Sequence, residues 1–247
     1  MRSISKTPLT NTAPANAGTV PSVSVKTTSS LSSLGPRIVS AAVLAPLVLG
    51  IVYFGSWPFN VLIGLVALIL AAEWAGMVGR RIPWMALGII YIALSCWALW
   101  RLRLDPEWGR MTVFWLLAVV WGADTGGFIF GLTLKGPKLA PAISPKKTWS
   151  GFVGGTLFAA VGGWAVVAIL KGSASLEIVA FSAAMGVVSQ VGDLFESWIK
   201  RRFGVKDSGV LIPGHGGLFD RVDGLVAAAL ITVLINIGFK GNVLAWL

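Results

Sequence analysis

Apolar stretches about as long as a lipid bilayer is thick recur along this chain from residue 38 onward. A membrane-spanning helix needs about 20 predominantly apolar residues. With 55% hydrophobic and only 12% charged residues, the chain also has too little polar surface for a soluble globule. We therefore predict an all-α polytopic integral membrane protein with about seven transmembrane helices, six to nine being compatible with the pattern. The stretches lie at roughly 38–55, 57–78, 82–100, 111–130, 151–170, 176–199 and 222–239.

The lysines and arginines predict the orientation of these helices. If the N-terminus is cytoplasmic, fourteen of the twenty fall in cytoplasmic segments and five in segments on the other side. Cytoplasmic loops of membrane proteins carry the excess of Lys and Arg. The polar loops that follow the spans 111–130 and 176–199 are therefore predicted to face the cytoplasm. These loops also explain the net charge of +10, so we expect a lipid bilayer and no nucleic acid as the partner of the basic residues.

Three segments follow from the same pattern. Residues 1–36 are rich in Ser, Thr, Pro and Ala and lack acidic residues, which predicts a disordered tail. Residues 37–110 form N-terminal transmembrane helices, and residues 111–247 form the domain that carries the chemistry. A dispensable tail fits a bacterial inner membrane, whereas an organellar transit peptide is the alternative reading. Glycines four residues apart predict close helix packing and permit a homodimer. They are Gly122 and Gly126, Gly127 and Gly131, and Gly151 and Gly155.

Two carboxylates lie inside predicted spans. Asp124, in VVWGADTGGFIFG, has no cation within ten residues on either side, and an unpaired charge inside a bilayer is costly. We predict that Asp124 lines a polar cavity, the alternative being a hydrogen-bonded structural Asp closer to the interface. Glu73 is followed seven residues later by Arg80, about two helical turns along the same face. A pairing with Arg80 and a functional role are both open for Glu73.

The loop KGPKLAPAISPKKTWSG, residues 135–151, combines prolines that prevent a continuous helix with four lysines. Ser144, Lys146 and Lys147 form a hydroxyl and ammonium cluster just before a predicted helix start. Such an arrangement suits phosphate oxygens. Phosphate binding and a plain topology signal are both compatible with this spacing.

Five of the ten acidic residues and the single histidine fall between Asp193 and Asp223. The spacing of Asp193, Glu196, Ser197 and Lys200 puts carboxylates and a cation on one helix face. Asp220 and Asp223 repeat the spacing of three at the start of the last span. Carboxylates from two helix ends with intervening cations favour a hard cation such as Mg²⁺ bound to phosphates over zinc, because the segment has no cysteine. The glycines of PGHGG let backbone N–H groups approach a ligand, or form a turn.

The segment SWIKRRFGVKDSGVLIPGHGGLFDRVD, from Ser197 to Asp223, resembles the signature of the CDP-diacylglycerol synthases, also called phosphatidate cytidylyltransferases. DTGG, residues 124–127, and ISPKKTWSG, residues 143–151, resemble the upstream motifs of that family, in the expected order. The likeness covers roughly residues 120–225, and three ordered motifs make it highly specific.

The resemblance implies a nucleotidyltransferase that converts CTP and phosphatidate to CDP-diacylglycerol and pyrophosphate in phospholipid biosynthesis. It implies Mg²⁺ as cofactor and leaves a second, monovalent cation open. By resemblance and by placement, Asp193 and Asp220 are the metal ligands. The cations expected to neutralise phosphate charge are Lys200, Arg201, Lys206 and Arg221. The residues expected to bind substrate are Asp124, Ser144, Lys146, Lys147, Ser197, His215, Gly216, Gly217 and Asp223.

Three alternatives remain. A CTP-dependent lipid or polyprenol kinase would use the same Mg²⁺ and phosphate chemistry but transfer the γ-phosphoryl group. A CDP-archaeol-type synthase would share the headgroup chemistry and differ in its lipid. A transporter would also explain an intramembrane Asp124, but it predicts an internal repeat that the sequence does not show.

Overall fold

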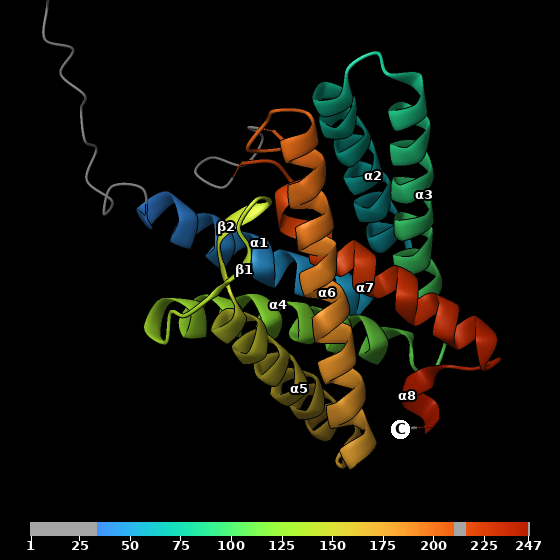
Figure 1. Cartoon of the computed structure of the whole chain (residues 1–247). Coiled ribbons are helices and arrows are strands. Elements are labelled where there is room, and N and C mark those ends of the chain that lie inside the picture. Colours follow the sequence, from blue (N-terminus) through green and yellow to red (C-terminus); the bar gives the residue numbers. More distant parts are fainter. Residues whose placement is uncertain (1–33, 210–215, 247) are drawn as a thin grey trace, which may run out of the picture.

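The computed structural model describes residues 34–209 and 216–246 as a bundle of helices with one small hairpin (Figure 1). The predicted disordered tail lies outside the described residues except for its last residues, where α1 begins. His215 also lies outside them. The elements are α1 (Leu34–Phe54), α2 (Ser56–Val78), α3 (Ile82–Arg103), α4 (Gly109–Thr133), β1 (Lys138–Ala140), β2 (Ser144–Thr148), α5 (Trp149–Lys171), α6 (Leu176–Arg202), α7 (Phe219–Gly238) and α8 (Val243–Trp246).

The predicted class of polytopic helical membrane protein is confirmed. Within the described residues, the six helices α2 to α7 are long and apolar enough to cross a membrane, each having 20 to 27 residues. The first predicted span, 38–55, falls in α1, of which Ala42–Phe54 belongs to the part of the chain whose side chains the structure describes. The described part of the chain thus contains six of the predicted spans, within the range of six to nine, and the span at 38–55 stays a prediction.

One departure from an all-α fold is the hairpin between α4 and α5. Its strands β1 and β2 pair antiparallel, with Lys138 opposite Thr148 and Ala140 opposite Ser144. Prolines exclude a helix here, and Thr148 both ends β2 and caps α5 by accepting a hydrogen bond from the backbone N–H of Gly151 at 3.1 Å. The cap fixes where the lysine-rich hairpin ends and the next membrane helix begins.

The glycine pairs bring α4 and α5 into close contact within one chain. A Cβ on Gly122 would lie 2.7 Å from the carbonyl oxygen of Phe158, and one on Gly155 would lie 2.7 Å from that of Ala123. Real side chains do not tolerate such distances, so only glycine permits this approach of the two backbones. The predicted close packing is confirmed. Because these glycines are used inside the chain, they are not evidence for a homodimer.

A separate apolar cluster joins the N-terminal helices to the end of α6 and the start of α7. α2 and α3 run side by side (Figure 1), and Trp74 of α2 packs on Phe219 of α7 with ring centroids 5.8 Å apart. Ile199 of α6 is fully buried in the same cluster. The C-terminal end of α2, the C-terminal end of α6 and the N-terminal end of α7 thus meet on one side of the bundle.

Candidate active site

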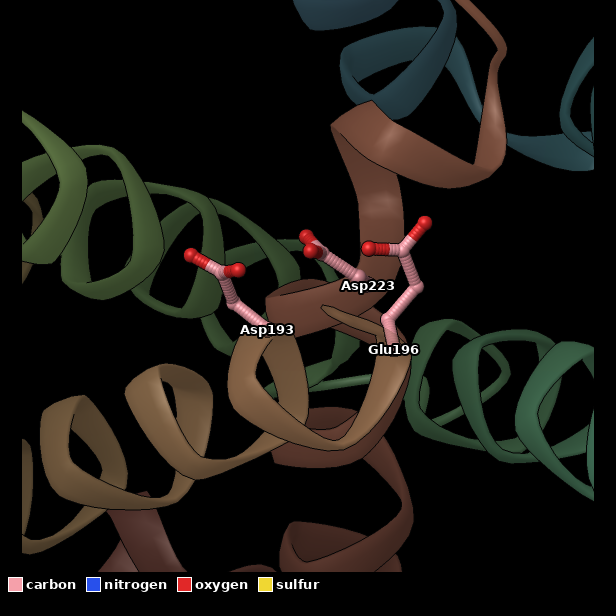
Figure 2. Close-up of side chains that lie close together, drawn as sticks. All are labelled: Asp193, Glu196 and Asp223. Atoms are coloured by element: carbon pink, nitrogen blue, oxygen red, sulfur yellow. The ribbon is translucent and has the colours of Figure 1, made fainter. Parts of the chain in front are cut away.

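Three carboxylates from two helices meet where α6 crosses α7. Asp193 and Glu196 lie one turn apart on α6, and Asp223 lies on α7. Each offers one oxygen atom, and these oxygens all lie within 4.8 Å of one another. Figure 2 shows the three side chains projecting from the two helices to the same side. Three negative charges at this spacing repel unless a cation lies among them.

Small residues at the crossing bring these carboxylates together. A Cβ on Gly192 would lie 2.5 Å from the Cβ of Ala227 and 2.9 Å from the carbonyl oxygen of Asp223. On the facing helix, a Cβ on Gly224 would lie 3.1 Å from the carbonyl oxygen of Ser189. The backbones of α6 and α7 therefore approach more closely than larger residues would allow, one position away from Asp193 and from Asp223.

Glu196 is the most buried member of the three, with 2% of its surface exposed. Its Oε2 lies 2.6 Å from Lys200 Nζ as an ion pair. Neither carboxylate oxygen of Glu196 accepts a hydrogen bond of regular geometry from the described residues. A buried carboxylate is stable only when it is paired and hydrogen-bonded or bound to a metal. The Glu196 carboxylate without a regular hydrogen bond, together with the oxygen-only donor set, fits a hard cation such as Mg²⁺.

Asp220, the other predicted metal ligand, is tied to this group through Lys200. Its Oδ1 lies 2.5 Å from Lys200 Nζ, so one ammonium bridges Asp220 and Glu196. Its Oδ2 accepts hydrogen bonds from the backbone N–H of Ser208 at 3.1 Å and of Gly217 at 3.0 Å. Asp220 is therefore held at the first turn of α7 by protein groups on both oxygens.

A cavity of about 540 Å³ lies between α4, the hairpin, α5 and α6, and Asp193 is the member of the three-carboxylate group that lines it. Asp124 and Asp193 line it from α4 and α6. Lys147 of the hairpin reaches across to Asp193, with Nζ 2.5 Å from Oδ2. Four lysines line this cavity, and they are Lys135, Lys138, Lys146 and Lys147. Such a cluster of cations beside carboxylates can hold a phosphorylated ligand together with a metal ion.

The apolar part of the same cavity wall comes from α4 and α5. Phe128 and Leu132 of α4 line it, and both side chains are largely exposed on the helix surface. Phe152 of α5 completes this part of the lining. One cavity thus combines a polar end with a hydrocarbon-lined wall.

The remaining predicted residues that the structure describes do not line the cavity, and Arg201 and Ser197 make side-chain hydrogen bonds to other parts of the site. Arg201 donates hydrogen bonds to the carbonyl oxygens of Ile143 and Val205, at 3.2 and 3.3 Å, and so ties the hairpin to the end of α6. Ser197 donates to Asp193 at 3.4 Å. The others stand at the same end of the bundle without lining the cavity: Ser144 is half-buried in β2, Lys206 and Arg221 are exposed, and Gly216 and Gly217 precede α7.

Two functional candidates were not assigned from the sequence. Glu196 lies three residues after Asp193, so the sequence shows that the two share a face of α6. The spacing does not show which of them faces the neighbouring helix. Glu73 gave only the signal of a carboxylate inside an apolar span. In the described structure Glu73 binds Ser208, Leu218 and Phe219 rather than Arg80, and no local spacing connects residues so far apart.

Comparison with known proteins shows the family to which the chain belongs. The profile of the Cytidylyltransferase family matches residues 80–237. A protein of Brucella suis biovar 1 (strain 1330) named phosphatidate cytidylyltransferase is 45% identical over 170 residues, 69% of this chain and 62% of the Brucella protein. A protein of the same name from Rickettsia felis (strain ATCC VR-1525 / URRWXCal2) is 36% identical over 214 residues, 81% of this chain and 91% of the Rickettsia protein. The chain belongs to the cytidylyltransferase family.

The extent of these matches differs between relatives. The chain spans about 62% of the length of the Brucella proteins that it matches. The match to a phosphatidate cytidylyltransferase of Rickettsia conorii (strain ATCC VR-613 / Malish 7) covers 83% of this chain and 92% of the relative, at 35% identity. The relatives are bacterial, and the three carboxylates and the lysines of the hairpin all lie inside the segment that the family profile matches.

Proposed function

We propose that this chain transfers the cytidylyl group of CTP to phosphatidate and so forms CDP-diacylglycerol and pyrophosphate. The observation that carries the proposal is the group of Asp193, Glu196 and Asp223 beside a lysine-lined cavity whose other wall is apolar. Such a cavity suits a ligand with both phosphate groups and a hydrocarbon part. The names of the bacterial relatives support the same substrates.

The proposed reaction is a phosphoryl-type substitution. A phosphate oxygen of phosphatidate forms a bond to the α-phosphorus of CTP, and the bond from that phosphorus to the oxygen bridging to the β-phosphate breaks. The electron pair of the broken bond leaves with pyrophosphate. Because the attacking phosphate is already ionised at neutral pH, no side chain has to accept a proton. Catalysis then depends on positioning and on neutralising charge.

The acidic residues would hold the metal ion. Mg²⁺, when bound, supplies positive charge that neutralises phosphate oxygens during the transfer. Asp193, Glu196 and Asp223 offer the oxygens for it. Asp220 remains a proposed ligand, although its Oδ1 would first have to exchange the ammonium of Lys200 for the cation. Asp193, Glu196, Asp220 and Asp223 together carry more negative charge than one Mg²⁺ neutralises, so we keep a second, monovalent cation in the proposal.

The basic residues are proposed to bind phosphate oxygens or to orient the carboxylates. Lys147 pairs with Asp193 and would exchange that carboxylate for a phosphate oxygen when substrate enters. Lys146 lines the cavity and is exposed to it, whereas Lys200 is buried between two carboxylates and so orients them. Lys206 and Arg221, exposed at the same end of the bundle, complete the proposed phosphate-binding set.

The proposed location is a bacterial inner membrane with the site facing the cytoplasm. The six candidate spans and the bacterial relatives support the membrane. The excess of Lys and Arg at the hairpin and at the end of α6 supports the cytoplasmic side. CTP and cytoplasmic Mg²⁺ would then reach the site directly.

A label-transfer assay tests the proposal. Purified protein in detergent is given phosphatidate and Mg²⁺ with CTP labelled at the α-phosphate or, separately, at the γ-phosphate. We expect label in the lipid fraction from the α position only, and none in the Asp193→Asn variant. Label from the γ position would mean a kinase. An isoprenoid ether phosphate is tried as a second acceptor. If only this lipid is labelled, phosphatidate is not the substrate. If neither lipid is labelled, the proposed activity is refuted.

A further inference from the structure

Glu73 stands in the N-terminal half of the chain, outside the segment that the family profile matches. It lies on α2 next to Trp74, which packs on Phe219. Its carboxylate reaches the N-terminal end of α7. Oε1 accepts a hydrogen bond from the backbone N–H of Leu218 at 2.8 Å, and Oε2 accepts one from that of Phe219 at 2.8 Å.

These two N–H groups belong to the start of a helix, where backbone donors have no acceptor within the helix itself. Leu218 is the N-cap residue of α7 and offers no side-chain cap. The carboxylate of Glu73 therefore takes the place of a capping side chain. Its negative charge also lies at the positive end of the helix dipole. Because Phe219 is only 1% exposed, water does not readily substitute for this acceptor.

Ser208 connects Glu73 to Asp220. The hydroxyl of Ser208 donates to Glu73 Oε2 at 3.0 Å, and the backbone N–H of the same residue donates to Asp220 Oδ2 at 3.1 Å. The backbone N–H of Gly217 donates to Asp220 Oδ2 at 3.0 Å, and that of the next residue, Leu218, donates to Glu73. Two carboxylates from opposite halves of the chain thus share donors from the same two short segments.

The packing around Glu73 leaves little room for another arrangement. A Cβ on Gly217 would lie 2.7 Å from Glu73 Oε2, and one on Gly209 would lie 2.8 Å from Oε1. Ser208 itself is 7% exposed. The Glu73 carboxylate is therefore enclosed by the backbone segments to which it is hydrogen-bonded. A movement of the carboxylate would displace these segments, and a movement of the segments would displace the carboxylate.

We propose that Glu73 is a positioning residue for the reaction. By holding Ser208 and the first N–H groups of α7, it sets the place of the Asp220 carboxylate and, through Lys200, that of Glu196. The expected effect of Glu73 on the reaction rate rests on the proposed cytidylyl transfer. The hydrogen bonds of Glu73 do not depend on that proposal. It also means that the N-terminal helices take part in the site, although the sequence division at residue 110 puts them outside the catalytic domain.

The first measurement is hydrogen exchange of the peptide that covers residues 216–222 in detergent. Wild type is compared with Glu73→Gln, Glu73→Ala and Ser208→Ala, and with Glu107→Gln as the matched control. Glu107 is exposed in the connection between α3 and α4 at the other end of the bundle. We expect faster exchange in all three test variants and unchanged exchange in the control.

The second measurement is kcat and KM for both substrates, together with the Mg²⁺ concentration for half-maximal rate. Residues that orient metal ligands cost about 10–100-fold in activity or metal affinity when replaced. We expect a loss in this range for Glu73→Ala, in kcat and in the Mg²⁺ requirement rather than in KM for phosphatidate. Glu73→Gln keeps one acceptor oxygen and should lose less, and Ser208→Ala should lose least.

Three results separate the possibilities. Faster exchange with unchanged kcat and Mg²⁺ requirement would overturn the positioning role, because Glu73 would then serve only the helix end. Unchanged exchange in Glu73→Gln and Ser208→Ala would overturn it as well, even where Glu73→Ala fails to fold. If wild type itself transfers no label to lipid, the proposed function fails, while the exchange result still decides whether Glu73 holds the start of α7.

Discussion

Replacing Lys200 with methionine tests how the buried charges are held. Lys200 is 9% exposed, and its ammonium lies 2.6 Å from Glu196 Oε2 and 2.5 Å from Asp220 Oδ1. Methionine fills a similar volume but leaves both carboxylates without their shared counter-charge. Removing one partner of a buried ion pair costs about 3–5 kcal/mol, because the other charge stays buried and unpaired.

That cost predicts a measurable loss of thermal stability. For a chain of this size, about 3–5 kcal/mol corresponds to a Tm lower by about 6–20 °C. The assay is thermal unfolding of the purified protein in detergent with EDTA present, so that no metal ion offsets the missing ammonium. Lys206→Met is the matched control for stability, since Lys206 is exposed and the same side-chain change there should shift Tm little.

A double variant tests the cause. If the penalty comes from uncompensated carboxylates, Glu196→Gln added to Lys200→Met should recover part of the lost stability, since it removes one of the two unpaired charges. Equal Tm values for wild type and Lys200→Met would refute the reasoning. A double variant that is less stable by the full sum of the single losses would refute it too.

The other predictions concern the carboxylates and the helix crossing. Asp193→Asn and Asp223→Asn should each lower lipid labelling by more than about 100-fold, beyond the loss typical of residues behind the ligands. Mg²⁺ at about 100 times its dissociation constant should stabilise wild type by about 2.7 kcal/mol in thermal unfolding; an equal shift in Asp223→Asn would contradict its role as a ligand. Gly192→Ala places a Cβ 2.5 Å from that of Ala227, so it should cost about 1–3 kcal/mol by overpacking and lower the rate. Gly64→Ala, where a Cβ meets nothing within 4 Å, is the control and should not destabilise.

The helices could be predicted because a bilayer imposes a length on each span. The predicted spans 57–78 and 82–100 correspond to α2 (Ser56–Val78) and α3 (Ile82–Arg103). The hairpin could be predicted only as a non-helical loop, since prolines exclude a helix but do not specify which residues pair.

The site was predictable where its residues lie close in sequence. Asp193 and Asp223 each stand in motifs that local spacing picks out, and the structure brings their carboxylates together with that of Glu196. The crossing that does so depends on Gly192 and Gly224, whose role appears only when the two helices are seen in contact. Glu73 could be noticed as a carboxylate inside an apolar span, but its contact with the start of α7 could not be predicted, because Leu218 lies 145 residues along the chain.

We propose that the three carboxylates and the lysines of the cavity together support cytidylyl transfer. The most direct test of this proposal is mass-spectrometric quantification of both products from unlabelled CTP and phosphatidate, with wild type beside Asp223→Asn. We expect CDP-diacylglycerol and pyrophosphate in equal amounts from wild type with Mg²⁺, and neither from the variant. Free CDP with no CDP-lipid, or equal product from the variant, would contradict the proposal.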